Sequence, residues 1–266
     1  MAEKPVLYFI HGMWAGPRVW EAYRAHFEAQ GYKTRAPALP GHDIEPGEMP
    51  PPELAHYSIV DYVAALEAEL REIEAPVVLV GHSLGGLIAQ ILAARLKPAG
   101  LVLLAPAPSA DILPLAWEPI RTCWPLLSRW GFWDEALTLP REVAFYGVFN
   151  GVPADIAEQD YAKAVSESGR VLAEVAFGAL APSRRTKVDY ALVRCPGLVV
   201  VGTEDRITPV TVARSTARRL PGPVQYRELD NVGHWLFHAP VRDKVFAHME
   251  GFLAQLAAER EVAPQA

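Results

Sequence analysis

Residues 77–92 read VVLVGHSLGGLIAQIL, and this stretch alone indicates a fold class. An apolar run from Val77 to Gly81 precedes a serine with glycines on both sides, and a second apolar segment with helical spacing follows. A strand that turns within a few residues into a helix is the first half of a βαβ unit, whose parallel strands are buried on both faces. The stretch therefore predicts a parallel sheet with a functional loop at its carboxyl edge.

Further apolar runs of the same kind lie on both sides of this unit. They are expected to form strands at 6–10, 33–38, 101–105, 197–202 and 224–229. An amphipathic helix is expected within 59–73, because apolar residues recur there every three or four positions. The right-handed crossover rule then favours a doubly wound, mostly parallel α/β sheet of about six strands with helices on its faces.

The alternating pattern is interrupted between residues 107 and 186. This segment has no convincing buried strand but is rich in aromatic residues: Trp117, Trp124, Trp130, Phe132, Trp133, Phe145, Tyr146 and Phe149. We expect a helical cap over the carboxyl edge of the sheet, with most of these rings forming the core of the cap itself. The expected organisation is a core at 1–106 and 187–258, the cap at 107–186, and a flexible tail at 259–266.

Composition narrows the class of protein. The 266 residues are 51% hydrophobic and 21% charged, which is typical of a globular chain with a large core. The formal net charge is -6 and no long basic run occurs, so nucleic acid is not expected as a partner. No apolar run approaches the length of a membrane span and no secretory leader is evident, so we expect no membrane association and a cytoplasmic location. The two cysteines, Cys123 and Cys195, are expected to be reduced and packed, and no metal-ligand spacing is present.

The sequence Gly-His-Ser-Leu-Gly at 81–85 is the main candidate for a catalytic motif. A serine on so tight a strand-to-helix turn adopts a strained backbone conformation, and glycines two residues away on each side let strand and helix approach. Such a turn exposes the Ser83 hydroxyl above the sheet. It also places the Leu84 N–H at a helix amino terminus, where it can stabilise a developing negative charge.

A serine hydroxyl is a poor nucleophile at neutral pH, so Ser83 needs an imidazole as base and a carboxylate to orient that imidazole. Asp205 is the expected acid, because it follows the strand at 197–202 at the sheet edge where such sites gather. Glu204 and Asp230 are the alternatives.

His234 is the expected base. It follows a glycine in the loop after the last expected strand, and the order serine, acid, histidine is the one found in this type of triad. His238, one helical turn further on, is the alternative.

A second backbone donor besides Leu84 is needed to stabilise the oxyanion. The turn His11-Gly12-Met13-Trp14 follows the first strand at the same sheet edge, so we expect the Met13 N–H to be this donor, with Trp14 N–H as the alternative. His11 and His82 are expected to brace their turns through hydrogen bonds.

On these motifs the chain resembles the α/β-hydrolase superfamily, specifically its small capped esterase and lipase-like enzymes with an H-G-x-W opening. The resemblance covers nearly the whole chain and rests on His11–Trp14, Trp20, Leu39–His42, Gly81–Gly85, Asp205 and His234. It implies a cofactor-free serine hydrolase with a helical cap. Related dehalogenases and epoxide hydrolases carry aspartate where Ser83 stands, and hydroxynitrile lyases carry lysine where Trp235 stands.

The resulting functional expectation is hydrolysis of small-molecule carboxylic esters through an acyl-enzyme. Trp14 and the aromatic cap favour a small-to-medium apolar acyl or aryl group, with Trp14 as a substrate-binding residue. Thioester or carbon-carbon bond hydrolysis by the same triad remains an alternative, as does a hydrolase-like receptor that binds a small molecule with negligible turnover. The sequence leaves the natural substrate and the oligomeric state open.

Overall fold

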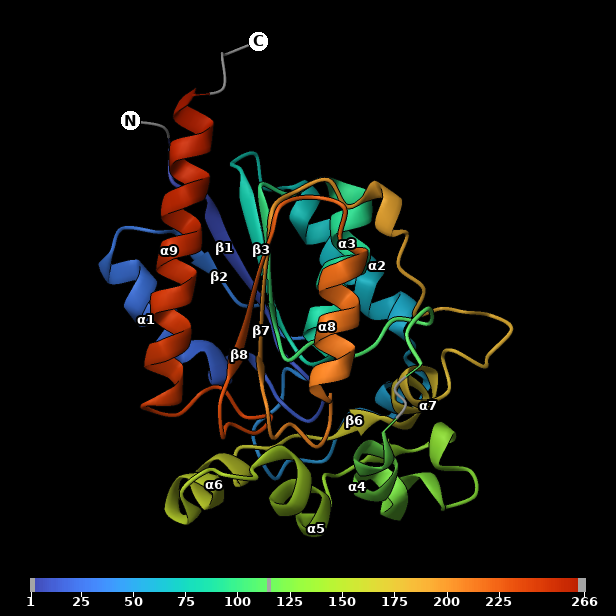
Figure 1. Cartoon of the computed structure of the whole chain (residues 1–266). Helices are drawn as coiled ribbons and strands as arrows, with labels where there is room; N and C mark the ends of the chain where they lie inside the picture. The colour runs from blue at the N-terminus through green and yellow to red at the C-terminus, as the bar shows by residue number, and fades with distance from the viewer. Residues whose placement is uncertain (1–2, 114–115, 263–266) are drawn as a thin grey trace.

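The computed structural model describes residues 3–113 and 116–262. Six strands form one sheet in the order β2-β1-β3-β4-β7-β8, and every neighbouring pair is parallel (Figure 1). The strands are β1 (Val6–Ile10), β2 (Thr34–Arg35), β3 (Val77–His82), β4 (Gly100–Leu104), β7 (Gly197–Gly202) and β8 (Val224–Leu229). The predicted α/β fold with a parallel sheet of six strands is confirmed.

Helices cover both faces of this sheet, as Figure 1 shows. Helices α1 (Glu21–Ala29) and α9 (Val241–Val262) lie against one face, and α2 (Ile59–Arg71), α3 (Leu84–Leu96) and α8 (Val210–Arg219) lie against the other. Side chains alternate along each strand, so Leu7 and Phe9 join the cluster with α1 and α9, whereas Tyr8 and Ile10 join the cluster with α2 and α3. Burial on both faces explains why β1, β4 and β7 are continuous apolar runs in sequence. The edge strand β8 is only partly buried and carries Gln225, Arg227 and Glu228.

Two expected segments differ from the structure by more than two residues at one end. The strand expected at 33–38 is reduced to the two residues of β2 at the sheet edge, where Pro37 has no N–H to donate to the ladder. Residues 259–262 of the expected tail are instead helical, because good helix formers such as Ala257 and Ala258 extend α9 to Val262. The remaining residues of that expected tail, 263–266, lie outside the described residues.

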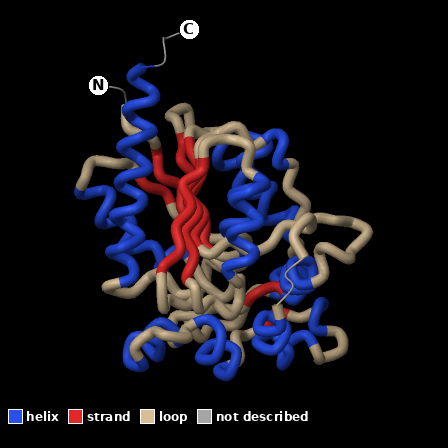
Figure 2. Tube along the Cα trace, viewed as in Figure 1, coloured by secondary structure: helices blue, strands red, loops and turns tan. Residues whose placement is uncertain are grey.

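The described residues of 107–186, referred to below as the cap segment, lie across the carboxyl ends of the sheet strands (Figure 1). Its elements are α4 (Trp117–Leu127), η3 (Phe132–Asp134), β5 (Ala136–Leu137), α5 (Arg141–Val143), η4 (Ala144–Val148), α6 (Ala154–Tyr161), β6 (Glu167–Ser168) and α7 (Gly169–Ala176). Figure 2 shows how little strand this segment contains beside the central sheet. Its β5 and β6 form a short antiparallel ladder that the sequence did not indicate, because two-residue strands leave no periodic pattern.

The aromatic residues of this segment are distributed differently from the expectation. Phe132 and Phe149 are buried, but Trp117, Trp124 and Trp130 are 66%, 61% and 91% exposed. The expectation that most of these rings form the core of the cap is therefore wrong for these tryptophans. Trp117 and Trp124 lie seven residues apart on α4, so they share one helix face, and that face is turned to solvent.

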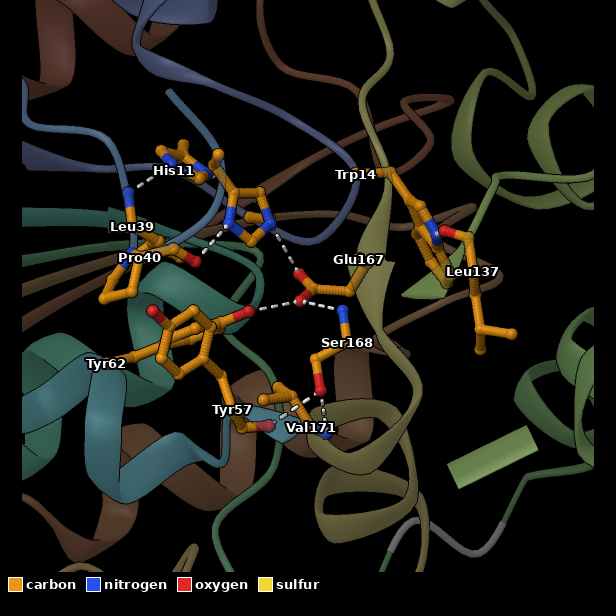
Figure 3. A network of polar contacts seen from close by, with 12 residues as sticks. His11, Trp14, Leu39, Pro40, Tyr57, Tyr62, Leu137, Glu167, Ser168 and Val171 are labelled. Carbon is orange, nitrogen blue, oxygen red and sulfur yellow. Dashed lines mark hydrogen bonds and ion pairs between the residues drawn. The ribbon is translucent and has the colours of Figure 1, made fainter. Parts of the chain in front are cut away.

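A buried polar network joins this segment to the core (Figure 3). Glu167 of β6 is fully buried, and its Oε1 accepts hydrogen bonds from the Tyr62 hydroxyl at 2.7 Å and from the Ser168 N–H at 2.6 Å. Its Oε2 lies 3.3 Å from Nε2 of His42. The Ser168 hydroxyl donates to the Tyr57 carbonyl at 2.7 Å. One carboxylate thus connects the segment to α2 and to the loop after β2.

The two histidines beside this carboxylate carry opposite pKa shifts. Burial disfavours the charged form of His42, but the Glu167 carboxylate outweighs burial and raises the pKa of His42. Burial, followed by the proximity of His42, lowers the pKa of His11 to about 3. Neutral His11 accepts from the Leu39 N–H at 3.1 Å, and its Nδ1–H donates to the Gly12 carbonyl at 2.9 Å. These bonds brace the turn that follows β1.

Candidate active site

Ser83 lies at the junction of β3 and α3 with a backbone φ of 54°. This positive φ is costly for a residue with a side chain, and the surrounding hydrogen bonds hold it in place. The Ser83 N–H donates to the Leu104 carbonyl at 3.0 Å, and its carbonyl accepts from the N–H groups of Gly86 and Ala107 at 2.9 Å each. The strained strand-to-helix turn expected from the sequence is therefore present.

The two flanking glycines are required by close backbone contacts. A Cβ on Gly81 would lie 2.2 Å from the Gly85 carbonyl oxygen, and a Cβ on Gly85 would lie 2.1 Å from the Ile10 carbonyl oxygen. Both separations are far below van der Waals contact, so only glycine allows β1, β3 and α3 to approach this closely.

Asp205 and His234 are joined by a hydrogen bond between their buried side chains. His234 Nδ1–H donates to Asp205 Oδ2 at 2.8 Å, and the two side chains are 3% and 0% exposed. Asp205 follows β7 and His234 follows β8, so neighbouring parallel strands deliver them to the same sheet edge. The alternative acids, Glu204 and Asp230, are exposed.

Thr208 completes the surroundings of the Asp205 carboxylate. Asp205 Oδ1 accepts from the N–H groups of Ile207 and Thr208 at 2.8 Å each, and the Thr208 hydroxyl lies 2.9 Å from Oδ2. That hydroxyl is also 3.2 Å from His234 Nδ1 and 2.9 Å from the Ala105 carbonyl oxygen. Thr208 therefore contacts both members of the pair, and the sequence reasoning missed it. In the sequence, the only indication of its role is its position three residues after Asp205.

Ser83 and His234 are held near each other through His82. His82 Nε2–H donates to the His234 carbonyl at 3.0 Å, and the two imidazole rings are 4.7 Å apart. Burial, and then the neighbouring His234, lower the pKa of His82 well below its usual value, so His82 is neutral at pH 7. Among the hydrogen bonds of the described residues, none joins the Ser83 hydroxyl to His234. The structure thus brings the serine turn and the histidine loop together without showing the proton-transfer contact.

An apolar cavity of about 130 Å³ lies beside Ser83. Met13, Trp14 and Leu84 line it together with Ser83, so the expected oxyanion and substrate residues share one wall. Leu127 of α4 lines the side formed by the cap segment. Asp205 and His234 lie outside the lining, whereas Thr208 is part of it.

Trp14 is bonded to the cap segment, and Figure 3 shows its indole beside Leu137. Its φ is 56°, its indole N–H donates to the Leu137 carbonyl at 3.0 Å, and its own carbonyl accepts from the Val165 N–H at 3.0 Å. The backbone of Gly12 packs against the serine turn, since a Cβ there would lie 3.1 Å from Ser83 Cβ. The turn at 11–14 is therefore in contact with both Ser83 and the cap segment.

Cys123 is the other nucleophilic side chain on the cavity wall. Burial raises the pKa of the Cys123 thiol to about 11, so at neutral pH it is a protonated thiol and a weak nucleophile. Both cysteines are free, in agreement with the expectation of reduced residues. Within residues 3–113 and 116–262, no group of His, Cys, Asp and Glu side chains could hold a metal ion.

A family model described as "Alpha/beta hydrolase family" matches residues 7–245. The chain belongs to the alpha/beta hydrolase family. This membership agrees with the resemblance drawn from the motifs at 11–14 and 81–85 and with the six-stranded parallel sheet.

Curated relatives of this chain include an esterase and a hydrolase. It is 32% identical over 253 residues to the pimeloyl-[acyl-carrier protein] methyl ester esterase of Aromatoleum aromaticum, covering 87% of this chain and 92% of that protein. It is 30% identical over 234 residues to the pyrethroid hydrolase of Sphingobium wenxiniae, covering 81% of this chain and 76% of that protein.

Solved structures show the same fold. The monoacylglycerol lipase of Paleococcus ferrophilus superposes with a TM-score of 0.69 at 19% identity, covering 96% of each chain. Within the part of the chain that the structure describes, no helix combines the length and apolar character needed to span a bilayer.

Proposed function

We propose that this protein is a serine hydrolase of carboxylic esters in which Ser83 is the nucleophile, His234 the base and Asp205 the acid. The observation that carries the proposal is the strained position of Ser83, at φ 54° between β3 and α3, on the wall of an apolar cavity. The buried His234–Asp205 hydrogen bond supports the assignment of the other two roles.

The proposed reaction proceeds in two steps. Ser83 Oγ attacks the acyl carbonyl carbon while His234 Nε2 takes the hydroxyl proton, and the N–H groups of Met13 and Leu84 stabilise the oxyanion. Collapse of the tetrahedral species breaks the ester bond, and His234 returns the proton to the leaving alcohol. Water, activated by His234, then attacks the acyl-enzyme and releases the acid.

Asp205 has an orienting role in this scheme. Its carboxylate holds the imidazole in the tautomer with the proton on Nδ1, which leaves Nε2 free to accept the serine proton. A small rotation of the Ser83 or His234 side chain must bring Oγ and Nε2 into hydrogen-bond distance, as catalytic contacts often tighten only when substrate is bound.

The choice of ester among the bonds that such a triad can cleave is supported by the relatives. The Aromatoleum protein is a methyl ester esterase by name, and the Paleococcus protein is a lipase. The apolar lining beside Ser83 favours an apolar group on the substrate. We also propose that residues 107–186 form the cap domain and that 1–106 and 187–258 form the hydrolase core.

The test is turnover of nitrophenyl esters from acetate to decanoate, combined with labelling by a fluorophosphonate probe that reacts with activated serines. The wild-type protein is expected to hydrolyse the shorter esters and to be labelled at Ser83. Ser83→Ala should lower kcat by about 10⁴-fold or more and abolish labelling. Turnover that survives Ser83→Ala would rule out the assigned nucleophile.

Two other outcomes would replace the ester assignment. Labelling of Ser83 with turnover of acyl thioesters or of β-diketones, but of no oxygen ester, would favour thioester or carbon-carbon bond hydrolysis by the same triad. Labelling without turnover of any of these substrates, together with tight binding of a small molecule, would favour a receptor.

A further inference from the structure

A second cavity, of about 390 Å³, lies on the other side of the turn after β1. Met13 and Trp14 line both cavities, so the two are neighbours across this turn. The second cavity is also lined by Trp235 and Phe237 of the loop that carries His234, and by Phe149 of the cap segment. Ser83 and His234 are not on its lining, but Trp235 directly follows His234 in the chain, so this cavity lies against the histidine loop.

The two volumes indicate how a substrate would be divided. Pockets for whole small-molecule ligands usually measure about 300 to 1,000 Å³. The cavity beside Ser83, at about 130 Å³, is too small by this measure and can hold only one small group. The second cavity, at about 390 Å³, falls within the range and has room for a larger group.

Three aromatic side chains on the lining of the second cavity, those of Phe149, Trp235 and Phe237, pack against one another. The Trp235 ring lies 5.0 Å from the Phe149 ring at 73° and 4.7 Å from the Phe237 ring. The Trp235 indole N–H donates to Asp160 Oδ2 at 2.9 Å, which fixes the orientation of its ring. Edge-to-face and offset arrangements of this kind are also those in which a ligand's aromatic ring packs best.

The charged groups on the lining form pairs. Lys163 Nζ lies 2.9 Å from Asp160 Oδ1, and Arg242 Nε lies 3.4 Å from Asp243 Oδ1.

Arg18 is likewise hydrogen-bonded to the Glu45 carboxylate, and Glu21 lies within electrostatic reach of the same guanidinium. Each cation thus already has a carboxylate partner, so the cavity suits an uncharged ligand better than a free anion.

The chemistry of ester cleavage indicates which half of the substrate, acyl group or alcohol, belongs in which cavity. The acyl carbon becomes bonded to Ser83 Oγ, so the acyl group belongs in the small cavity that Ser83 lines. The leaving oxygen receives its proton from His234, so the alcohol belongs on the side of the histidine loop, where Trp235 and Phe237 line the large cavity.

We propose that the substrate is an ester of a small apolar acid with an uncharged aromatic alcohol, whose ring binds in the second cavity against Trp14, Phe149 and Trp235. This inference rests on the proposed function. Attack by Ser83 forms the acyl-enzyme and breaks the bond between the acyl carbon and the alcohol oxygen. The serine proton, carried by His234, neutralises that oxygen, and the aromatic alcohol leaves through the second cavity before water enters.

The experiment compares kcat/KM for 2-naphthylmethyl butanoate, methyl butanoate and methyl 2-naphthylacetate. The first and third place the same ring on opposite sides of the ester, and the first and second share one acyl group. We expect 2-naphthylmethyl butanoate to exceed each of the other two at least about tenfold, because its ring alone reaches the large cavity.

Two variants test the placement of the ring. Ile156→Trp, on the cap side of the second cavity, fills that cavity and should lower the ratio of naphthylmethyl to methyl butanoate about tenfold. Phe149→Ala removes part of the aromatic wall and should lower the same ratio severalfold, which provides a second answer if one variant fails to fold. Leu127→Phe, in the small cavity, is the matched control: it should favour acetate over butanoate and keep the preference for the aromatic alcohol.

The outcomes separate this inference from the proposed function. If methyl butanoate is hydrolysed as fast as 2-naphthylmethyl butanoate, or if methyl 2-naphthylacetate is the best substrate, the inference is wrong and the esterase assignment stands. If no ester is hydrolysed and Ser83 is not labelled by the fluorophosphonate, the proposed function fails, and the inference fails with it.

Discussion

The core and the cap segment use apolar side chains in different ways. Every residue of β1 and of β4 is buried, because helices cover both faces of the sheet. In α4 of the cap segment, by contrast, only Thr122 and Leu126 are buried, while both of its tryptophans face solvent. Apolar character therefore identifies buried positions in the core, whereas in the cap segment the same residue types also line cavities and the outer surface.

The largest predicted effect tests how tightly the core is packed. Gly85→Ala places a methyl group 2.1 Å from the Ile10 carbonyl oxygen, so we expect the free energy of unfolding to fall by about 3 kcal/mol or more. Gly251→Ala on α9 is the matched control, because a Cβ at this position would have no atom within 4 Å, and helix propensity should stabilise the variant by about 0.5 to 1 kcal/mol. Urea denaturation measures both, and equal stability of the two variants would contradict the packing argument.

A second prediction tests the buried contact between cap segment and core. His42→Asn removes the imidazole beside Glu167 and should lower the free energy of unfolding by about 2 kcal/mol at pH 6. Because the pKa of folded His42 is raised above its unfolded value, the stabilisation is fully present below about pH 6.5. It is lost as the pH rises through the folded-state pKa.

The measurement is urea denaturation of wild type and His42→Asn between pH 6 and pH 9. The difference between the two should shrink as the pH rises. Glu167→Gln, which removes the carboxylate charge, should show less of this pH dependence than the wild type. A difference that stays constant from pH 6 to pH 9 would mean that the pair is not ionised in the folded protein.

A third prediction concerns the hydroxyl beside the Asp205 carboxylate. Thr208→Val keeps the shape of the side chain but removes the group 2.9 Å from Oδ2, so kcat should fall about tenfold with little change in KM. Thr208→Ser retains a hydroxyl and should restore most of the rate. Steady-state kinetics with nitrophenyl butanoate decide this, and equal impairment of the two variants would indicate a packing role only.

The smallest predicted effect is on the outer surface of the cap segment. Trp130 is 91% exposed, and its ring packs at 5.1 Å only against Trp133 among the aromatic pairs of the described residues. Trp130→Ala should therefore change the free energy of unfolding by less than about 0.5 kcal/mol. A thermal or urea unfolding curve shifted by much more would place this ring in an interface.

The sequence predicts the core well because local patterns suffice there. Val6–Ile10 and Gly197–Gly202 were expected with the same boundaries that the structure shows, since strands buried on both faces are continuous apolar runs. The cap segment was harder, because exposed Trp117 and Trp124 have the same helical spacing as core residues. Sequence spacing gives the helix face but not what lies opposite it.

Local sequence patterns also predicted part of the candidate site. Asp205 and His234 were expected from their places after strands, and the structure joins them by a hydrogen bond. The catalytic roles of Asp205 and His234 stay predictions that kinetics must test, as do the roles of Ser83, Met13, Leu84 and Trp14.

The two side chains that contact Glu167, those of His42 and Tyr62, lie more than 100 residues away along the chain, and no local pattern reveals such a contact. The second cavity likewise depends on how the cap segment packs on the core. Contacts of this range become visible only in three dimensions.

Trp14 connects the two regions compared above. Its indole and its carbonyl are bonded to Leu137 and Val165, which lie in and beside the cap segment's short ladder, while its neighbour Gly12 packs on the serine turn. Grafting the cap of a relative onto this core would therefore require the matching 11–14 turn to be transplanted with it. An engineer who wishes to change specificity should treat that turn as part of the exchanged module.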